Sequence, residues 1–333
     1  MRETACSISI GRHALKSRAF LAPMAGITDR PQRDLAARFG AGAVVSEMIA
    51  SAALSAGNGD MVRKLNRSPG LPHIVQLAGC EPQWMAAGAR IAEAAGADII
   101  DVNFGCPAKR VTNGYAGSAL MRVPELAQRL VESVVGATAL PVTVKMRLGW
   151  DDESLNAPEI AGRAVEAGAQ MITVHGRTRQ QFYKGQARWE MVRAVVEAVD
   201  VPVVVNGDIV DIDTARAALV QSGAAAVMMG RGAQGQPWIV GQIGAALDGL
   251  DGPSTPVGDD LANIVAEHYE GVLSEYGVEV GVRAARKYLD WYLAAAAISV
   301  SSDARHRLLN SFVPAEVLGL IADLFGSNLR IAA

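Results

Sequence analysis

The chain has 333 residues, half of them hydrophobic and a fifth charged, which suits one large domain with a smaller appendage and argues against disorder. A net charge of −3 and a pI near 6.0 exclude a uniformly basic nucleic-acid-binding protein, so any RNA would have to be bound by local positive charge. The three cysteines are scattered and form no CxxC pair, which argues against a disulfide framework and a zinc site and indicates a reducing cytoplasm.

The N-terminal segment and the repeating elements after it predict a barrel. Residues 2–16 predict a hairpin that closes the bottom of the barrel, because Ile8, Ile10 and Leu15 suit strands. Short apolar runs then alternate with alanine-rich helical segments such as 83–95 and 157–168. The predicted strands are 19–25, 43–49, 73–78, 98–104, 141–147, 171–176, 201–206 and 225–230. Alternation predicts a parallel sheet, and eight units favour a closed (β/α)8 barrel over an open doubly wound sheet.

Small and reactive residues follow nearly every predicted strand. In a (β/α)8 barrel the carboxyl ends of all strands meet on one rim, where active sites lie. A single buried polar residue there could be structural, but a whole ring of them indicates a site. The residues at these strand ends are Pro23, Met24, Ala25, Glu47, Gln76, Asn103, Cys106, Lys145, Arg147, His175, Arg177, Asn206, Gly207, Asp208, Gly230 and Arg231.

The loops after the seventh and eighth strands predict a phosphate site. Glycines let backbone N–H groups approach an anion, and Arg231 adds positive charge. Either loop alone is an ordinary turn, but the two together favour a phosphorylated cofactor. Residues 230–235 also match G-x-G-x-x-G, yet a dinucleotide fingerprint usually opens the first βαβ unit, so we reject that interpretation. The residues of the site are Asn206, Gly207, Asp208, Gly230 and Arg231.

Three residues of the rim suggest chemistry. Cys106 lies in a turn shaped by glycine and proline, and a thiol with an ordinary pKa of ~8.5 is mostly protonated at neutral pH and can donate a proton. Cys80, by contrast, is expected to be a small buried hydrophobe. Lys145, on an apolar strand, predicts either a Schiff-base lysine or a cation facing an anionic cofactor. His175 is a core histidine or a contact to cofactor or substrate.

The two longest rim loops mix aromatic and basic side chains. Such mixtures suit stacked bases and phosphates, although a solvated loop is an equally open interpretation for any one residue. The residues are Lys109, Arg110 and Tyr115 in one loop, and Arg179, Phe182, Tyr183 and Lys184 in the other.

The C-terminal part of the chain predicts a separate helical domain. A barrel over 1–248 is followed by a Gly/Pro-rich linker, 249–258, and by a domain over 259–333. Its predicted helices are 259–276, 281–298, 301–311 and 314–325. The domain has six basic residues (Arg283, Arg286, Lys287, Arg305, Arg307 and Arg330) against ten acidic ones. RNA binding there must therefore be patch-like, and Arg283, Arg286 and Lys287 are spaced to share one helical face, although a solvated face is an equally open interpretation.

Localisation and assembly are expected to be simple. The uncharged stretch 291–302 is shorter than the ~20 apolar residues of a membrane helix. The N-terminus lacks the long apolar run of a secretory signal. We expect a cytoplasmic monomer that needs neither a membrane nor a metal ion.

Seven segments of the barrel resemble the tRNA-dihydrouridine synthase family. The segments are LAPMAGITD (21–29), VQLAG (75–79), DVNFGCPAKRVTNGYAGSALM (101–121), VTVKMRLGW (142–150), TVHGRTRQQFYKGQARW (173–189), PVVVNGDI (202–209) and MMGRGAQGQPWI (228–239). The tail segment 283–292 resembles the bacterial B-type branch of that family. One departure is Phe104, where methionine is usual; it leaves Cys106 in place and affects only packing.

The resemblance implies an FMN cofactor, NADPH as electron donor and tRNA as substrate. Pro23, Met24 and Ala25 would line the flavin, Gln76 would bond its ring edge, and Lys145 would face the N1/O2 side. His175 would join this cofactor site, and the predicted phosphate site would hold the ribityl and phosphate groups. The tRNA contacts expected are Asn103, Lys109, Arg110, Tyr115, Arg177, Arg179, Arg283, Arg286 and Lys287.

The resemblance also implies the reaction. A uridine of the D-loop, with tRNA position 17 as the candidate, is drawn out so that its ring stacks on the flavin. Hydride from flavin N5 goes to uracil C6, and Cys106 protonates C5 from the other face. Three alternatives stay open: a flavin barrel acting on a small molecule, like dihydroorotate dehydrogenase; a Schiff-base aldolase; and a non-catalytic RNA-binding protein.

Overall fold

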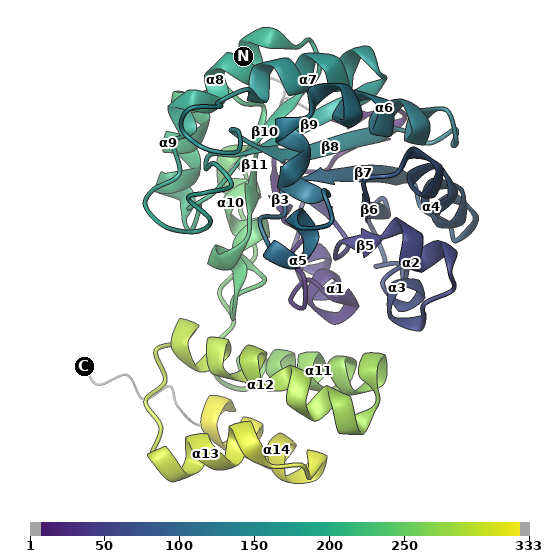
Figure 1. Ribbon diagram of the computed structural model, residues 1–333. Helices are drawn as coiled ribbons and strands as arrows, with labels where there is room; N and C mark the ends of the chain where they lie inside the picture. The colour runs from purple at the N-terminus through teal and green to yellow at the C-terminus, as the bar shows by residue number, and fades with distance from the viewer. Residues whose placement is uncertain (1–7, 327–333) are drawn as a thin grey trace. The chain divides into compact units, whose positions relative to one another are not determined.

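The computed structural model describes residues 8–326, which form two compact units (Figure 1). The first unit comprises 8–232 and Val240–Gly252, and the second comprises Ala233–Ile239 and 253–326. The sequence-based division placed 233–239 in the barrel domain, whereas the structure groups this segment with the tail. Trp238 shows the reason, because its ring is buried and stacks on Tyr292 with 6.3 Å between centroids. Cys6 and Arg330 lie outside the described residues.

The first unit is a parallel β-barrel, which confirms the predicted fold class. Its strands are β3 (Ala19–Leu21), β4 (Ala43–Val44), β5 (Ile49–Ala50), β6 (Ile74–Ala78), β7 (Ile99–Phe104), β8 (Val142–Arg147), β9 (Ala169–His175), β10 (Val203–Asn206) and β11 (Ala226–Met229). They pair in the order β4-β3-β11-β10-β9-β8-β7-β6-β5. Because β4 and β5 are the two ends of one predicted strand, and Val45 between them bridges Ile74 in parallel, the ring closes.

Helices surround this sheet, as Figure 1 shows for α4, α6, α7, α8 and α9. The helices of the unit are α1 (Arg30–Arg38), α2 (Ser51–Ser55), α3 (Gly59–Arg63), α4 (Pro82–Ala94), α5 (Lys109–Thr112), α6 (Pro124–Val135), α7 (Ala157–Glu166), α8 (Arg193–Ala198), α9 (Ile212–Ser222) and α10 (Ile239–Leu247). Local sequence fixes several ends. In α9, for example, Asp211 and Thr214 form a capping box, and Gly223 ends the helix at φ +70°.

The predicted N-terminal hairpin is confirmed and closes one end of the barrel. Its strands β1 (Ser9–Ile10) and β2 (His13–Ala14) pair antiparallel. Ile8, Ile10 and Leu15 are buried and share a hydrophobic cluster with barrel residues such as Phe20 and Val204. The hairpin therefore seals the end of the barrel at which the strands begin, and leaves the opposite rim for a site.

The second unit is a helical bundle, as the sequence predicts. Its helices are α11 (Gly258–Tyr276), α12 (Val278–Ala295), α13 (Ser302–Asn310) and α14 (Pro314–Ile321), followed by a π-helical turn (Ala322–Gly326). His268 is buried beside Tyr288 and Tyr292, and burial lowers its pKa to about 3, so it is a neutral core residue. Within residues 8–326, no helix combines the length and the apolar character needed to cross a bilayer.

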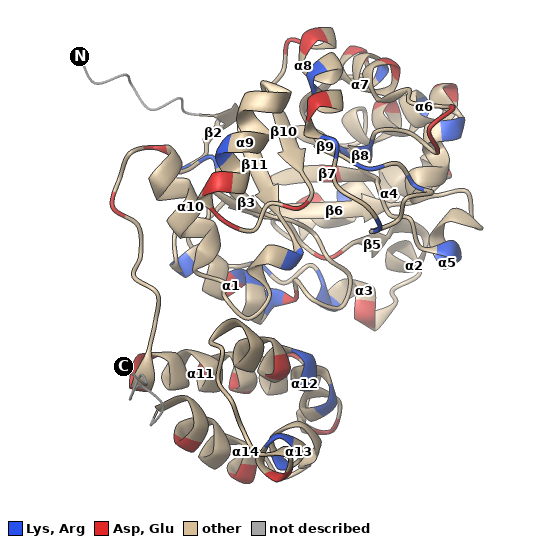
Figure 2. Cartoon of the chain, turned by 90° about the vertical axis from the view of Figure 1, so that its left-hand side faces the viewer, with Lys and Arg blue, Asp and Glu red and all other residues tan. Residues whose placement is uncertain are grey.

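Charge is distributed differently over the four helices of the bundle (Figure 2). The α11 and α14 segments contain acidic residues and no lysine or arginine, whereas α12 and α13 contain both signs. A basic patch in this unit is therefore confined to α12 and α13, which include the predicted Arg283, Arg286 and Lys287.

Candidate active site

The register of the barrel strands brings the predicted residues together on one rim. Asn103 of β7 lies opposite Lys145 of β8, and Asn206 of β10 lies opposite His175 of β9. Arg147, at the end of β8, lies opposite the same His175. Four neighbouring strands thus place an amide, an ammonium group, an imidazole and a second amide around the same mouth.

Lys145 is a buried cation held by a neutral group. Its Nζ donates to Asn206 Oδ1 at 2.9 Å, and Asn206 Nδ2 donates to the Met228 carbonyl at 2.8 Å. Burial, reinforced by repulsion from Arg147, lowers the pKa of Lys145 to about 8. An ammonium group desolvated in this way is stabilised by an anion, so the site favours an anionic ligand.

His175 is neutral at physiological pH. Burial first, and then repulsion from Arg147, Lys145 and Arg177, hold its pKa well below the usual value. Gly207, at φ +115°, lies against this ring, and a Cβ there would come within 2.9 Å of His175 Cδ2. Glycine is therefore required at position 207 by both the backbone conformation and the histidine.

Arg177 proves to be an internal residue, which corrects its expected role as a tRNA contact. It is 2% exposed, and its guanidinium donates to the carbonyls of Lys184 and Gly185 and to Asp208 Oδ2. These bonds hold the loop 177–185 on the rim and leave the guanidinium little capacity for a phosphate. Arg177 is therefore removed from the expected tRNA contacts.

Asp208 organises the end of β10. Burial pushes its pKa up, but the hydrogen bonds from Arg177 and from the amide of Ala187 outweigh this effect and keep the pKa below its usual value. Arg231 approaches the other carboxylate oxygen at 3.5 Å and remains half exposed. A carboxylate repels phosphate, so Asp208 fits a role in orienting Arg177 and Arg231 better than one as a direct phosphate ligand.

The loops that follow β3 and β11 lie side by side, because these two strands are paired in parallel. A Cβ at Gly230 would come within 3.4 Å of Met24 Sδ, and Leu21 pairs with Met229 in the register. The Arg231 guanidinium lies 5.1 Å from the centroid of the Tyr183 ring. The expected flavin-lining loop and the expected phosphate loop are thus adjacent.

The turn of Cys106 is held from several sides. Its N–H donates to Asn103 Oδ1 at 3.0 Å, and its carbonyl accepts from the Ser118 hydroxyl at 2.9 Å. Arg147 Nε donates to the preceding carbonyl, that of Gly105, at 2.8 Å. Cys106 is partly exposed as a residue, while the backbone that carries its thiol is held by these hydrogen bonds.

Cys80 differs from its prediction. It is also partly exposed, because it lies in the loop between β6 and α4 rather than in the core. Burial and the neighbouring Glu81 raise its pKa. The protein thus provides an internal comparison for Cys106.

The two aromatic rim loops have strained, exposed tips. Tyr115 and Phe182 have φ values of +58° and +57° and are 72% and 41% exposed. Residues other than glycine are uncommon in this conformation, and strain of this kind clusters at functional sites. Arg122 and Arg179 stack on Trp150, with 4.9 and 4.7 Å to the ring centroid. Neither Trp150 nor Arg122 was predicted from the sequence as a site residue.

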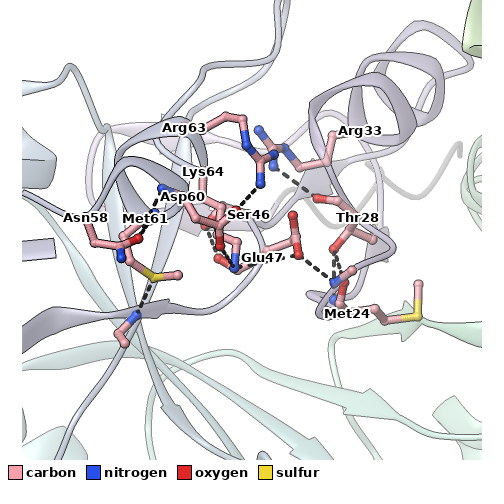
Figure 3. Close-up of polar contacts among 12 residues, drawn as sticks. Met24, Thr28, Arg33, Ser46, Glu47, Asn58, Asp60, Met61, Arg63 and Lys64 are labelled. Carbon is pink, nitrogen blue, oxygen red and sulfur yellow. Dashed lines mark hydrogen bonds and ion pairs between the residues drawn. The ribbon is translucent and has the colours of Figure 1, made fainter. Parts of the chain in front are cut away.

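A buried carboxylate that the sequence analysis left without a role fixes the loop after β3 (Figure 3). Glu47 is 2% exposed; its Oε1 accepts the N–H of Gly26 at 2.5 Å and lies 3.9 Å from Lys64 Nζ. Thr28 Oγ1 accepts from the Met24 amide at 2.8 Å. These hydrogen bonds hold Met24 in place. The feature of the sequence that could have indicated this role is the position of Glu47 near the end of a predicted strand.

The three tail residues lie on α12 with partners in their own unit. Arg283 pairs with Glu279 at 3.0 Å, the Arg286 guanidinium lies 5.1 Å from the ring centroid of Phe312, and Lys287 Nζ lies 4.7 Å from that of Tyr288. Arg283 is exposed, whereas Arg286 and Lys287 are partly buried. An exposed ion pair such as that of Arg283 with Glu279 contributes little stability, so Arg283 can exchange this partner for a phosphate. Across residues 8–326, no cluster of histidine, cysteine and acidic side chains could hold a metal ion.

Comparisons with known proteins agree with this geometry. The family model described as "Dihydrouridine synthase (Dus)" matches residues 20–322. The "Probable tRNA-dihydrouridine synthase" of Rhodobacter capsulatus is 53% identical over 97% of this chain and 99% of its own. "tRNA-dihydrouridine synthase B" of Pseudomonas putida is 43% identical over 86% of each chain.

Solved structures support the same barrel at greater distance. Morphinone reductase superposes with a TM-score of 0.53 and 15% identity, covering 76% of this chain and 92% of its own. Histamine dehydrogenase from Rhizobium sp. 4-9 gives a TM-score of 0.55 and 16% identity, covering 79% and 50%. At this level of identity the likeness is one of fold.

Proposed function

This chain belongs to the dihydrouridine synthase family, which makes it an oxidoreductase that acts on the CH–CH bond of uracil. On this premise we propose that it reduces a D-loop uridine of tRNA with FMN and NADPH. The observation that carries the proposal is the pairing of a buried cation, Lys145, with a reachable thiol, Cys106, on neighbouring strand ends. Position 17 of the tRNA is the uridine we propose, and the enzyme acts as a monomer in the cytoplasm.

The donor set of the rim fits a flavin mononucleotide. Lys145 would offer a desolvated positive charge to the flavin ring, and His175 would add a neutral imidazole to the same site. Arg231 and the glycine-containing turns after β10 and β11 suit the phosphate, while Pro23, Met24 and Ala25 suit the ring. When bound, the flavin would supply the hydride that uracil C6 receives, and the reduced nicotinamide would then reduce the flavin again.

The chain itself supplies position and a proton. Conjugation with the C4 carbonyl places developing negative charge at uracil C5, which then needs an acid within reach. The fixed turn of Cys106 presents a thiol there, while Asn103, Tyr115 and Arg179 border the same mouth. Because the uridine must leave its stack to reach the rim, the exposed aromatic tips at Tyr115 and Phe182 suit bases that lose their neighbours.

Two alternatives are weaker on specific grounds. A flavin barrel for a small molecule would explain the rim but gives no role to the helical unit or to the exposed aromatic loops. A Schiff-base aldolase would also use a lysine with a lowered pKa, but the family model that matches residues 20–322 is that of the dihydrouridine synthases.

Flavin retention tests the cofactor proposal. The protein should purify yellow and release FMN rather than FAD, because the proposed site ends at one phosphate. Replacing Arg231 and Asn206 together with alanine should weaken FMN binding, since one change removes the exposed cation and the other leaves Lys145 without its acceptor. FMN affinity is measured by fluorescence titration. Arg90→Ala, on the outer helix α4, is the control. A colourless protein that cannot be reconstituted with FMN would refute the flavin.

The salt dependence of tRNA binding tests the helical unit. Replacing Arg283, Arg286 and Lys287 with alanine should weaken tRNA binding and lower the slope of log affinity against log salt by ~0.7–0.9 for each phosphate that the protein no longer neutralises. Flavin reduction by NADPH should not change. Filter binding at several salt concentrations gives the slope, and Arg129→Ala, exposed on α6, is the control. Lys109, Arg110 and Arg179 should contribute in the same way. Unchanged affinity and slope in the triple variant would remove the unit from tRNA binding.

A further inference from the structure

A line of buried polar groups runs beneath the turn of Cys106. Asp101 and Asn103 lie two residues apart on β7, with Gln76 of β6 and Thr143 of β8 opposite Asp101 in the register. All four are buried, with exposed fractions between 1% and 7%. Thr143 Oγ1 donates to Asp101 Oδ1 at 2.6 Å, and Gln76 Nε2 donates to Asp101 Oδ2 at 2.7 Å.

The line continues from Gln76 to the cysteine. Asn103 Nδ2 donates to Gln76 Oε1 at 2.7 Å. Asn103 Oδ1 then accepts the N–H groups of Gly105 and Cys106 at 3.2 and 3.0 Å. Two side-chain amides therefore connect a carboxylate in the barrel to the backbone that carries the thiol.

The chemistry of the two ends sets the direction of both amides. An amide side chain has nearly the same shape when its oxygen and nitrogen exchange places, so packing alone does not orient it. A carboxylate only accepts hydrogen bonds, so Gln76 must turn its NH2 group toward Asp101 and its oxygen toward Asn103. Asn103 must then turn its NH2 group toward Gln76, which leaves its oxygen for the two backbone N–H groups.

We propose that Asp101 is a positioning residue: it fixes the orientation of the Gln76 and Asn103 amides and, through them, the turn that presents Cys106. This inference rests on the proposed function only for the role of the thiol. Lys145, on β8, is the charged group that Asp101 faces, while β6 presents the neutral Gln76. The pKa of Asp101 is raised, because burial outweighs the bonds from Gln76 and Thr143 and the charge of Lys145, which favour the carboxylate form. In the structure both carboxyl oxygens accept hydrogen bonds, one from Thr143 and one from Gln76.

Reversing the direction of the line gives a sharp test. In Asn103→Asp, the new carboxylate still accepts from Gly105 and Cys106 but presents a second oxygen to Gln76 Oε1. In the double variant Asp101→Asn/Asn103→Asp, Gln76 can turn over. Its oxygen then accepts from the new amide at position 101, and its NH2 group donates to the new carboxylate at position 103. Every group is satisfied again, with the direction reversed.

Thermal unfolding of the flavin-loaded protein against pH measures this effect. We expect Asn103→Asp to lower the Tm by roughly 2–6 °C near neutral pH, as for one unpaired buried polar group. Two facing oxygens and burial raise the folded-state pKa of the new carboxyl, so the folded state binds more protons. The deficit should therefore grow as pH rises from ~4, the unfolded pKa, through the raised folded pKa, and then stay constant.

The double variant shows whether the Tm loss in Asn103→Asp comes from the direction of the hydrogen bonds or from altered packing. It should recover most of the lost Tm and lose the added pH dependence. A double variant no more stable than the sum of the two single changes, or an Asn103→Asp deficit that does not vary with pH, would overturn the proposal. This measurement needs no tRNA, so its failure is distinct from failure of the proposed function.

Turnover tests the consequence for the thiol. Asp101→Leu removes the acceptor, and oxidation of the reduced flavin by saturating tRNA should slow about tenfold or more, with little change in tRNA affinity. Asp101→Asn should stay within about threefold of the original rate, because its oxygen can accept from Gln76 while its NH2 group donates to Thr143. Thr143→Val, which leaves the direction unchanged, is the matched control. Equal losses in all three variants would contradict the assigned role.

Discussion

Cys106→Ala should lower dihydrouridine formation by ~10²–10⁴-fold, the contribution usual for a positioned general acid. FMN binding and reduction of the flavin by NADPH should be unchanged, because neither step uses the thiol. Rapid-mixing absorbance follows each half-reaction. The loss of flavin absorbance on addition of NADPH should stay fast, and the recovery of this absorbance on addition of tRNA should become slow. Mass spectrometry of nucleosides from the product tRNA confirms the loss.

The second rim cysteine is the control for this result. Cys80 is also partly exposed but lies in the loop after β6, away from the turn that Asn103 and Ser118 hold. Cys80→Ala should therefore keep near-normal turnover. Near-normal turnover in Cys106→Ala, or an equal loss in Cys80→Ala, would remove Cys106 from the reaction.

Lys145→Met should slow reduction of the flavin by ~10²–10³-fold and weaken FMN binding. The reason is electrostatic: a preorganised cation in a desolvated site stabilises negative charge that develops on the cofactor, and removing one such group costs about this much. Methionine keeps most of the side-chain volume, so the change removes charge rather than packing. Stopped-flow reduction by NADPH in reconstituted protein gives the rate, with Lys184→Met on the rim loop as the control. A variant that keeps both FMN affinity and rate would show that Lys145 has another role.

The pH dependence of FMN binding gives an independent check on Lys145. Its pKa is lowered to about 8, so the ammonium of the cofactor-free protein loses its proton as pH rises above that value. FMN affinity in titrations should therefore fall between pH 8 and 10, and this fall should be absent in Lys145→Met. The free energy of unfolding of the cofactor-free protein should instead rise over this pH range. The reason is that the unfolded chain keeps the lysine proton up to pH ~10.4, whereas the folded chain loses it earlier. An affinity that is constant over this range would contradict the lowered pKa.

The sequence by itself determined the architecture and the place of the site. Strand and helix signals are local: the run 201–205 is apolar over its whole length, and the helix that follows is capped by Asp211 and Gly223. Eight such units and the parallel-sheet rule suffice for a barrel, and the rule that strand ends meet on one rim suffices to collect Cys106, Lys145 and Asn206. The family followed from motifs that are contiguous in the chain.

The tertiary structure alone decided which partner each polar group has. Arg177 is chemically suited to phosphate, but the fold brings Asp208 and two carbonyls to it and buries it. Trp238 gave no local sign that it would pack on Tyr292 of α12. The direction of the Gln76 amide depends on Asp101, which is 25 residues away, and the acceptor of Lys145 lies 61 residues away. Such pairs are set by strand register and barrel closure, and these are properties of the whole chain that a local pattern does not encode.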